Sequence, residues 1–145
     1  MSASGINESA IRQCVELFNK RTLEWVDTCF TEELVWTELP IAGISRGRQG
    51  NRAFLRETAV SILRLYPDRQ MSIRNLVAQD DKVVLELDWW GTTAEASGSL
   101  SAGTRIHFRV ASFFKLADGL IVSQTDYCVP MPGEVASQEY YDFRE

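Results

Sequence analysis

The sequence predicts an α+β fold in which helices come first and an antiparallel sheet follows. Before residue 67, apolar residues recur mainly at helical spacing. From residue 71 onward, apolar and polar residues alternate, and turn signals separate the runs. Helices segregated from strands in this way are typical of α+β folds rather than parallel α/β folds. We therefore expect a curved, mainly antiparallel sheet with three N-terminal helices packed on its concave face.

Three helices are predicted in the first part of the chain. Asn7 is the expected N-cap of the first helix, which runs to about Lys20. Thr22 is expected to cap a short second helix. The third helix is predicted over residues 51–65, because a stripe of apolar residues recurs there and Pro67 ends it.

One strand is predicted between the second and third helices, at residues 34–39, where Pro40 closes it. Arg46 and Arg48 follow in a Gly-containing segment that we expect to form a loop or a helix start. Four further strands follow in two pairs, each pair joined by a turn. These are residues 71–78 and 82–92 around Gln79-Asp80-Asp81, and residues 104–116 and 120–129 around Ala117-Asp118-Gly119.

The length of the last turn decides which face of the sheet carries Asp126. A three-residue loop at 117–119 would pair Val110 with Asp126 and point the acid to the apolar side. A two-residue loop would pair Ala111 with Asp126 and place the acid among arginines. We favour the three-residue loop, because Asp126 shares its own face with apolar neighbours such as Cys128.

Composition limits the range of functions. The chain has 145 residues, 45% hydrophobic and 24% charged, which fits one domain over residues 1–145. The net charge of −5 is spread along the chain and resembles no nucleic-acid-binding footprint. We find no signal-peptide pattern and no run long enough to cross a bilayer. We therefore expect a cytoplasmic protein that binds neither nucleic acid nor membranes.

The cysteines and the acidic residues suggest different roles. Cys14, Cys29 and Cys128 lack metal-ligand spacing and lie among apolar residues, so we expect buried, reduced thiols and no metal site. Three acids lie within the most apolar, strand-like stretches of the chain, where an unpaired ionised carboxylate is costly. They are Glu38, Asp88 and Asp126. We therefore expect a shared acidic pocket.

We expect this pocket to be walled mainly by aromatic and aliphatic side chains. Glu86 shares the face of Asp88 by alternation, so both enter the pocket or neither does. The expected substrate-binding residues are Phe18, Trp36, Glu86, Trp90, Phe108 and Val110. The opposite face of the strand at 82–92 then carries an apolar patch of Val83, Leu85, Leu87 and Trp89. We expect a homodimer to form through this convex face, or the C-terminal segment to cover the patch.

Two segments resemble the nuclear-transport-factor-2-like superfamily. They are CFTEELVWTELPIAGISRGRQGNRAFL (residues 29–55) and DGLIVSQTDY (residues 118–127). This superfamily includes ketosteroid isomerases, SnoaL-type polyketide cyclases and limonene-epoxide hydrolases. The resemblance covers nearly the whole chain. It implies a cone-shaped α+β fold around a small-molecule pocket.

The resemblance also implies roles for the acids. By resemblance to the limonene-epoxide hydrolases, Asp126 of this chain aligns with their water-activating aspartate. Asp88 aligns with their acid that protonates the epoxide. The arginine two residues earlier is replaced here by Glu86, and the water-holding tyrosine and asparagine fall on Trp36 and Glu38. In the cyclase type, Asp126 matches the general acid/base.

In ketosteroid isomerases, Glu38 takes the place of the proton-shuttling aspartate. The oxyanion-stabilising tyrosine falls on Cys14 and its partner aspartate falls near Ala111, so the oxyanion hole is missing.

Two functions follow as expectations. The first is a cofactor-independent enzyme that performs isomerisation, cyclisation, dehydration or epoxide opening on a small, largely apolar molecule. In it, Asp126 is the base, Asp88 the acid, and Glu38 a second base or water holder. The second is a non-catalytic module that binds a ligand or a partner protein. We also expect the segment at residues 137–145 to fold over the mouth of the cone.

Overall fold

The computed structural model describes residues 2–41 and 44–132, and these residues form three helices and six strands. In chain order they are α1 (Ala3–Asn19), α2 (Glu24–Cys29), β1 (Phe30–Glu38), β2 (Arg48–Gly50), α3 (Arg52–Leu65), β3 (Gln70–Gln79), β4 (Lys82–Thr92), β5 (Arg105–Ala117) and β6 (Leu120–Met131). The expected covering role of residues 137–145 lies outside the described residues.

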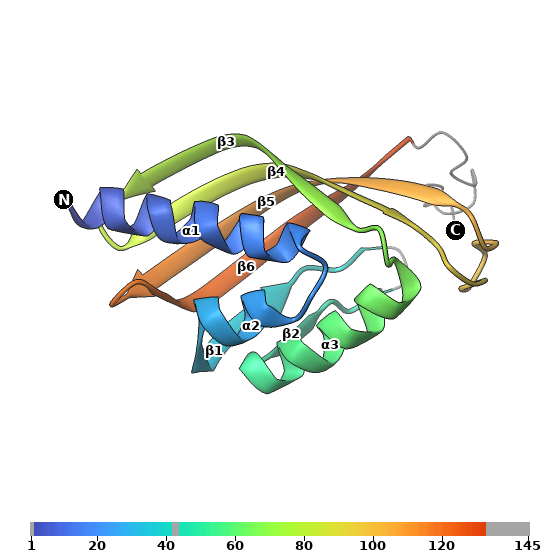
Figure 1. The fold of residues 1–145 in the computed structure, drawn as a ribbon, viewed down its shortest axis with the longest axis horizontal. Helices are drawn as coiled ribbons and strands as arrows, with labels where there is room; N and C mark the ends of the chain where they lie inside the picture. Colours follow the sequence, from blue (N-terminus) through green and yellow to red (C-terminus); the bar gives the residue numbers. More distant parts are fainter. Residues whose placement is uncertain (1, 42–43, 133–145) are drawn as a thin grey trace.

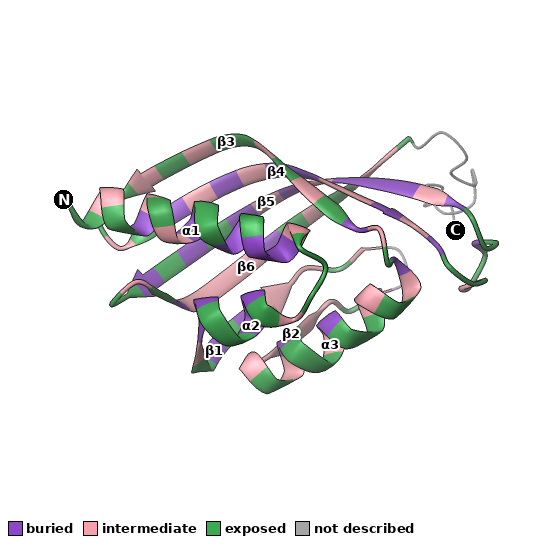
Figure 2. Cartoon of the chain, viewed as in Figure 1, coloured by how far each residue is buried: buried purple, intermediate pink, exposed green. Residues whose placement is uncertain are grey.

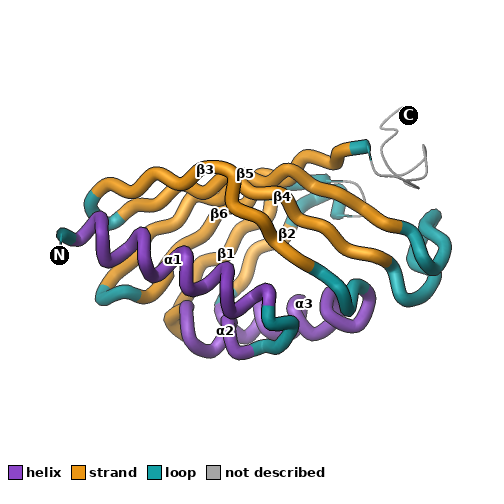
Figure 3. The backbone as a smooth tube through the Cα atoms, turned by 45° about the horizontal axis from the view of Figure 1, so that its top comes forward, coloured by secondary structure: helices purple, strands orange, loops and turns teal. Residues whose placement is uncertain are grey.

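The six strands form one curved sheet in the order β2-β1-β6-β5-β4-β3. The helices lie together over its concave face (Figure 1) and leave the opposite face uncovered (Figure 3). All neighbouring strands are antiparallel except β1 and β6, which run parallel. The predicted α+β fold is therefore confirmed. No sequence pattern indicated the parallel pair, which joins the first and last long strands inside the sheet.

The ends of the helices differ in part from the prediction. α1 begins earlier than expected, with Ser2 as its N-cap, whose hydroxyl accepts a hydrogen bond from the Gly5 amide. Asn7 is instead buried in the helix, and its side-chain amide donates to the Asp80 carbonyl at 2.8 Å. α3 begins as predicted, because the Asn51 side chain accepts from the Phe54 amide.

The buried apolar residues form a core between the helices and the sheet, and Figure 2 shows buried positions on both the helices and the strands. Residues from α1, α2 and α3 pack there against β4, β5 and β6. Among the buried charged side chains, Arg69 is fully inaccessible to solvent. Its guanidinium donates to the carbonyls of Phe18 and Thr22 and lies 4.0 Å from the Phe18 ring centre. Arg69 therefore fastens the end of α1 to the start of β3.

Strand β6 reaches its predicted orientation by an unexpected route. The β5–β6 turn has two residues, with Ala117 paired to Leu120, so the predicted three-residue loop is wrong. A register shift follows at once, between Lys115 and Leu116 on β5. Beyond it, Asp126 pairs with Ser112, so the acid points to the concave side as predicted, but beside Ser112 rather than Val110.

The predicted orientation of β4 is wrong. Leu85 and Leu87 face the concave side and are almost fully buried, whereas Asp88 and Trp90 face the convex side. Alternation sorts the residues of a strand into two sets but does not say which set points inward. Burying the apolar set gains hydrophobic free energy without desolvating two acids, and that balance decides the orientation.

Candidate functional site

A cavity of about 770 Å³ lies between the helices and the concave face of the sheet. Its walls are mostly apolar and come from all three helices and all six strands. Of the residues predicted to bind substrate, Phe18, Trp36, Phe108 and Val110 line it. A cavity of this size suits a small organic molecule.

The cavity contains one cluster of polar side chains, contributed by four strands. Glu38 on β1 and Asp126 on β6 are direct partners in the parallel register of these strands. Arg48 on β2 is the antiparallel partner of Glu38 on its other side. Ser112 on β5 is the partner of Asp126. Neighbouring strands thus present two carboxyl groups, one guanidinium group and one hydroxyl group to the same part of the cavity.

The Asp126 carboxylate is held by three donors. Its Oδ2 accepts from Trp36 Nε1 at 2.9 Å, and its Oδ1 accepts from Ser112 Oγ at 2.6 Å. The Gln124 amide Nε2 donates to both oxygens, at 2.9 and 3.1 Å. These contacts fix the orientation of the carboxyl group within an otherwise apolar wall.

Glu38 forms an ion pair with Arg48 that uses only one of its oxygens. Arg48 Nε and Nη2 both approach Oε1, at 2.8 and 2.7 Å. The guanidinium also lies over the Trp36 ring, 5.3 Å from its centre. The second oxygen of Glu38, Oε2, lies 3.8 Å from the Cys128 thiol. Glu38 therefore keeps one oxygen without a charged partner in the described part of the chain.

The two acids have perturbed protonation equilibria. Burial raises the pKa of Asp126, although its hydrogen bonds and the charge of Arg48 oppose that shift. Burial also raises the pKa of Glu38, where Arg48 opposes the shift and the charge of Asp126 adds to it. Two carboxyl groups that repel each other in this way hold and release protons at higher pH than isolated acids.

Cys128 lies beside the acids but is poorly suited to act as a nucleophile. Burial and the negative charges of Glu38 and Asp126 raise the pKa of its thiol well above the ordinary range. A thiol in such surroundings remains protonated, and the thiolate is the reactive form. Cys128 therefore serves as a neutral neighbour of Glu38.

Three predicted site residues lie outside the cavity. Glu86, Asp88 and Trp90 face the convex side, so the prediction that Asp88 shares a pocket with Glu38 and Asp126 is wrong. Asp88 Oδ1 is instead 2.6 Å from His107 Nε2 and 2.8 Å from Arg109 Nε.

Other convex-face contacts complete this arrangement. Arg74 binds the Oδ2 of Asp88 at 2.9 Å. Trp90 stacks on His107, and Glu86 accepts from Asn75. Burial opposes ionisation of Asp88, but hydrogen bonds from His107, Arg109 and Arg74 hold its pKa well below the usual range.

Three polar residues of the cluster were missed by sequence reasoning. In place of the expected loop or helix start, Arg48 lies on the short strand β2 and reaches Glu38. The signal available was Gly47, whose backbone φ of +66° marks the turn that brings Arg48 back alongside Glu38. Ser112 and Gln124 sit on the same faces as Val110 and Asp126, so alternation placed them correctly without indicating a role.

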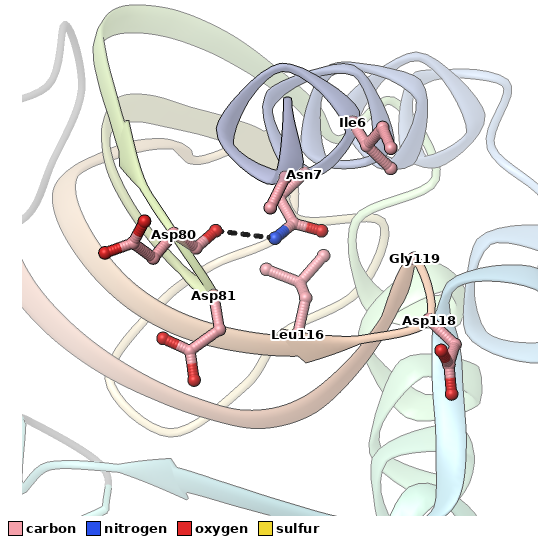
Figure 4. A pocket seen from close by; sticks show the side chains of 8 residues that line it. Ile6, Asn7, Asp80, Asp81, Leu116, Asp118 and Gly119 are labelled. Carbon is pink, nitrogen blue, oxygen red and sulfur yellow. Dashed lines mark hydrogen bonds between the residues drawn. The ribbon is translucent and has the colours of Figure 1, made fainter. Parts of the chain in front are cut away.

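A second depression lies at the other end of the molecule, between the start of α1 and the β3–β4 and β5–β6 turns (Figure 4). Three aspartates surround it, Asp80, Asp81 and Asp118. Asp80 is tied down by its backbone, whose amide donates to Ser4 Oγ and whose carbonyl accepts from Asn7. These contacts join the start of α1 to the β3–β4 turn, so the depression lies at a structural junction.

Residues 2–41 and 44–132 contain no group of three or more His, Cys, Asp or Glu side chains arranged to hold a metal ion. No helix within these ranges has both the length and the apolar composition needed to cross a membrane.

Solved structures share this fold. AclR, a candidate hydroxylase from Streptomyces galilaeus, is 17% identical, with a TM-score of 0.73 over 86% of this chain and 76% of that one. IdmH, a candidate polyketide cyclase from Streptomyces antibioticus, is 18% identical, with a TM-score of 0.72 over 84% and 91%. An LEH-like epoxide hydrolase from M. tuberculosis is 14% identical, with a TM-score of 0.69 over 88% and 81%.

At these identities the similarity establishes the fold alone, which is that of the nuclear-transport-factor-2-like proteins. No curated protein sequence matches this chain significantly. A family model does match, over residues 11–124, which include the three helices' cavity-facing residues and most of the sheet. The chain therefore belongs to the SnoaL-like domain family.

Proposed function

We propose that this protein is an enzyme that performs acid/base chemistry on a small, largely apolar molecule in the cavity. The observation that supports it is the register pairing of Glu38 with Asp126, with Arg48 bound to one of the two acids. Paired carboxyl groups with raised pKa values at the edge of an apolar cavity suit proton transfer.

Each polar residue has a role in this proposal. Asp126 is the base, since its carboxylate is oriented by three donors and lines the cavity. Glu38 is the general acid, the role expected from sequence for Asp88. It delivers a proton from Oε2. Arg48 keeps Glu38 in position and stabilises negative charge that develops on the substrate.

The reaction classes compatible with this equipment share one step, the removal of a proton from a carbon acid or from water. Cyclisation and isomerisation begin at a carbon next to a carbonyl group, whereas epoxide opening begins with water. The M. tuberculosis neighbour is described as an epoxide hydrolase and IdmH as a candidate cyclase. Arg48 supplies in space the arginine that is missing next to Asp88 in sequence, so epoxide opening stays among the proposed reactions.

The experiment is a turnover screen with matched variants. Small epoxides, β,γ-unsaturated ketones and short β-polyketones are incubated with the wild type, Asp126→Asn and Glu38→Gln, and proton exchange or product formation is followed by NMR in D2O. We expect activity in the wild type and its loss in both variants. Asp88→Asn on the convex face is the control and should retain activity. Turnover that survives in Asp126→Asn would contradict the proposal.

A second function, as a ligand-binding module without turnover, has one observation in its favour. Three side chains donate to the Asp126 carboxylate, and a carboxylate held in this way also suits a structural role. Ligands from the same screen that bind tightly, are released unchanged and bind equally to Asp126→Asn would support this module.

We also propose that two copies pair through the convex face of the sheet. Phe113, Tyr127 and Val129 are exposed there on neighbouring strands, with Phe113 and Tyr127 in edge-to-face contact. These residues replace the β4 patch that we first expected to form the dimer, because that patch is buried. Pairing through this face would leave the cavity on the other side accessible.

A further inference from the structure

The Gln124 side chain, on β6, has an unexplained feature. Its Nε2 donates to both oxygens of Asp126, but its Oε1 is buried and accepts no hydrogen bond in the described part of the chain. A buried acceptor without a donor costs free energy. The amide nevertheless keeps this orientation beside an ionised Asp126, because the opposite one would place its oxygen against the carboxylate.

The donors around Asp126 determine where a proton can be added. The Trp36 indole N–H can only donate, and it faces Oδ2. Ser112 faces Oδ1, Gln124 contacts both oxygens and lies nearer to Oδ1, and each of these side chains can also accept a hydrogen bond. A proton taken up by Asp126 therefore belongs on Oδ1, where it needs an acceptor.

We propose that Gln124 is a positioning residue whose amide reverses when Asp126 is protonated, so that Oε1 accepts from the Oδ1–H group. This inference rests on the proposed function of Asp126 as the base. The same amide then serves both states of the carboxyl group: Nε2 binds the ionised form and Oε1 binds the neutral form. In each state one half of the amide lacks a partner, which accounts for the unpaired oxygen in the present orientation.

Other charged or titratable groups face Asp126 without replacing Gln124. Glu38 approaches from β1, Arg48 from β2 and the Cys128 thiol from β6. In the described part of the chain, none of the three forms a hydrogen bond with the Asp126 carboxyl. They influence its charge through space, whereas Gln124 and Ser112 contact the oxygen that carries the proton.

The first test is a carbon-13 NMR titration of the Asp126 carboxyl in the resting protein. The Trp36 N–H donates to Oδ2 in both states but binds the ionised carboxylate more strongly, so Trp36→Phe should raise the pKa of Asp126 by about one pH unit. Gln124→Met removes both a donor to the ionised form and an acceptor for the Oδ1–H of the neutral form, so the two losses offset and the pKa should change by much less. If Gln124→Met raises the pKa as much as Trp36→Phe does, Gln124 is a fixed donor and the proposal is wrong.

A second measurement does not depend on the folding of the Trp36 variant. Neutron diffraction of the wild type at high pH and of Asp126→Asn should show opposite orientations of the Gln124 amide, because the Asn side chain donates as the neutral acid does. The same orientation in both would overturn the reversal. Neither test requires turnover, so either can fail while acid/base activity stands, and loss of the proposed activity would leave both results interpretable.

Discussion

Glu38 and Asp126 lie side by side on parallel strands, as register partners of β1 and β6. They are far apart in sequence and belong to the first and last long strands of the sheet. Their proximity exists only because β6 returns to the middle of the sheet and pairs with β1. The site therefore depends on this parallel pairing.

The wild type and Asp126→Asn should differ in how their stability depends on pH. Burial raises the pKa of Asp126, so the folded state favours the neutral acid. Its favourable contribution is complete below the pKa of the unfolded chain and is lost as the pH rises through the higher folded-state value. The free energy of unfolding of the variant, relative to the wild type, should therefore increase with pH. Chemical denaturation between pH 4 and pH 8 measures this, and a difference that falls with pH would contradict it.

Removing Arg48 should reduce activity more than stability. Arg48→Met leaves Glu38 beside Asp126 without its cation, so the pKa of Glu38 should rise further and kcat should fall by about 10²-fold. Arg56→Met is the matched control, since Arg56 pairs with Asp27 in an exposed ion pair away from the cavity. The pH–rate profile and kcat of both variants provide the comparison. Equal effects of the two substitutions would argue against a role for Arg48.

Asp88→Asn should lower stability without affecting chemistry. The substitution leaves His107, Arg74 and Arg109 without their shared carboxylate, and it should cost about 2 kcal/mol at pH 7. Because the folded-state pKa of Asp88 is depressed, its contribution is complete above the unfolded pKa of about 4 and declines as the pH falls below it. Urea unfolding of the wild type and Asp88→Asn at pH 7 and at about pH 3 should show the difference in their free energies of unfolding narrowing at the lower pH. A large loss of kcat in Asp88→Asn would contradict this prediction and indicate a catalytic role for Asp88.

Phe113→Asp should abolish the proposed dimer while leaving the fold intact. Phe113 is 49% exposed on the convex face, and a charge there would be buried in a dimer interface. Val60→Asp is the control, because Val60 is similarly exposed at 46% but lies on α3. Sedimentation velocity should show a dimer for the wild type and Val60→Asp and a monomer for Phe113→Asp. A monomeric wild type would refute the pairing.

Local sequence patterns predicted much of this structure. Helical spacing and the Asn51 cap located α3, and alternation with turn signals located β3 to β6. Alternation also placed Phe108 and Val110 on the cavity side. These features depend on neighbours within a few residues, which a sequence displays directly.

The position of Asp126 shows the limit of such reasoning. The predicted face was correct, but the loop length that supported it was wrong, because a register shift beside Leu116 compensates for the shorter turn. A one-residue shift reverses every side chain beyond it. No pattern in the strand indicated the shift.

What the sequence alone determined was the α+β class, the order of the elements and the presence of acids within apolar strands. Only the tertiary structure decided which acids meet. Asp88 lies outside the cavity, contrary to the prediction, because the packing of Leu85 and Leu87 decides which face of β4 is buried. Arg48 joins the acids in the cavity because β2 pairs with β1. Both outcomes depend on contacts between distant segments, whose free energy of burial outweighs any local preference.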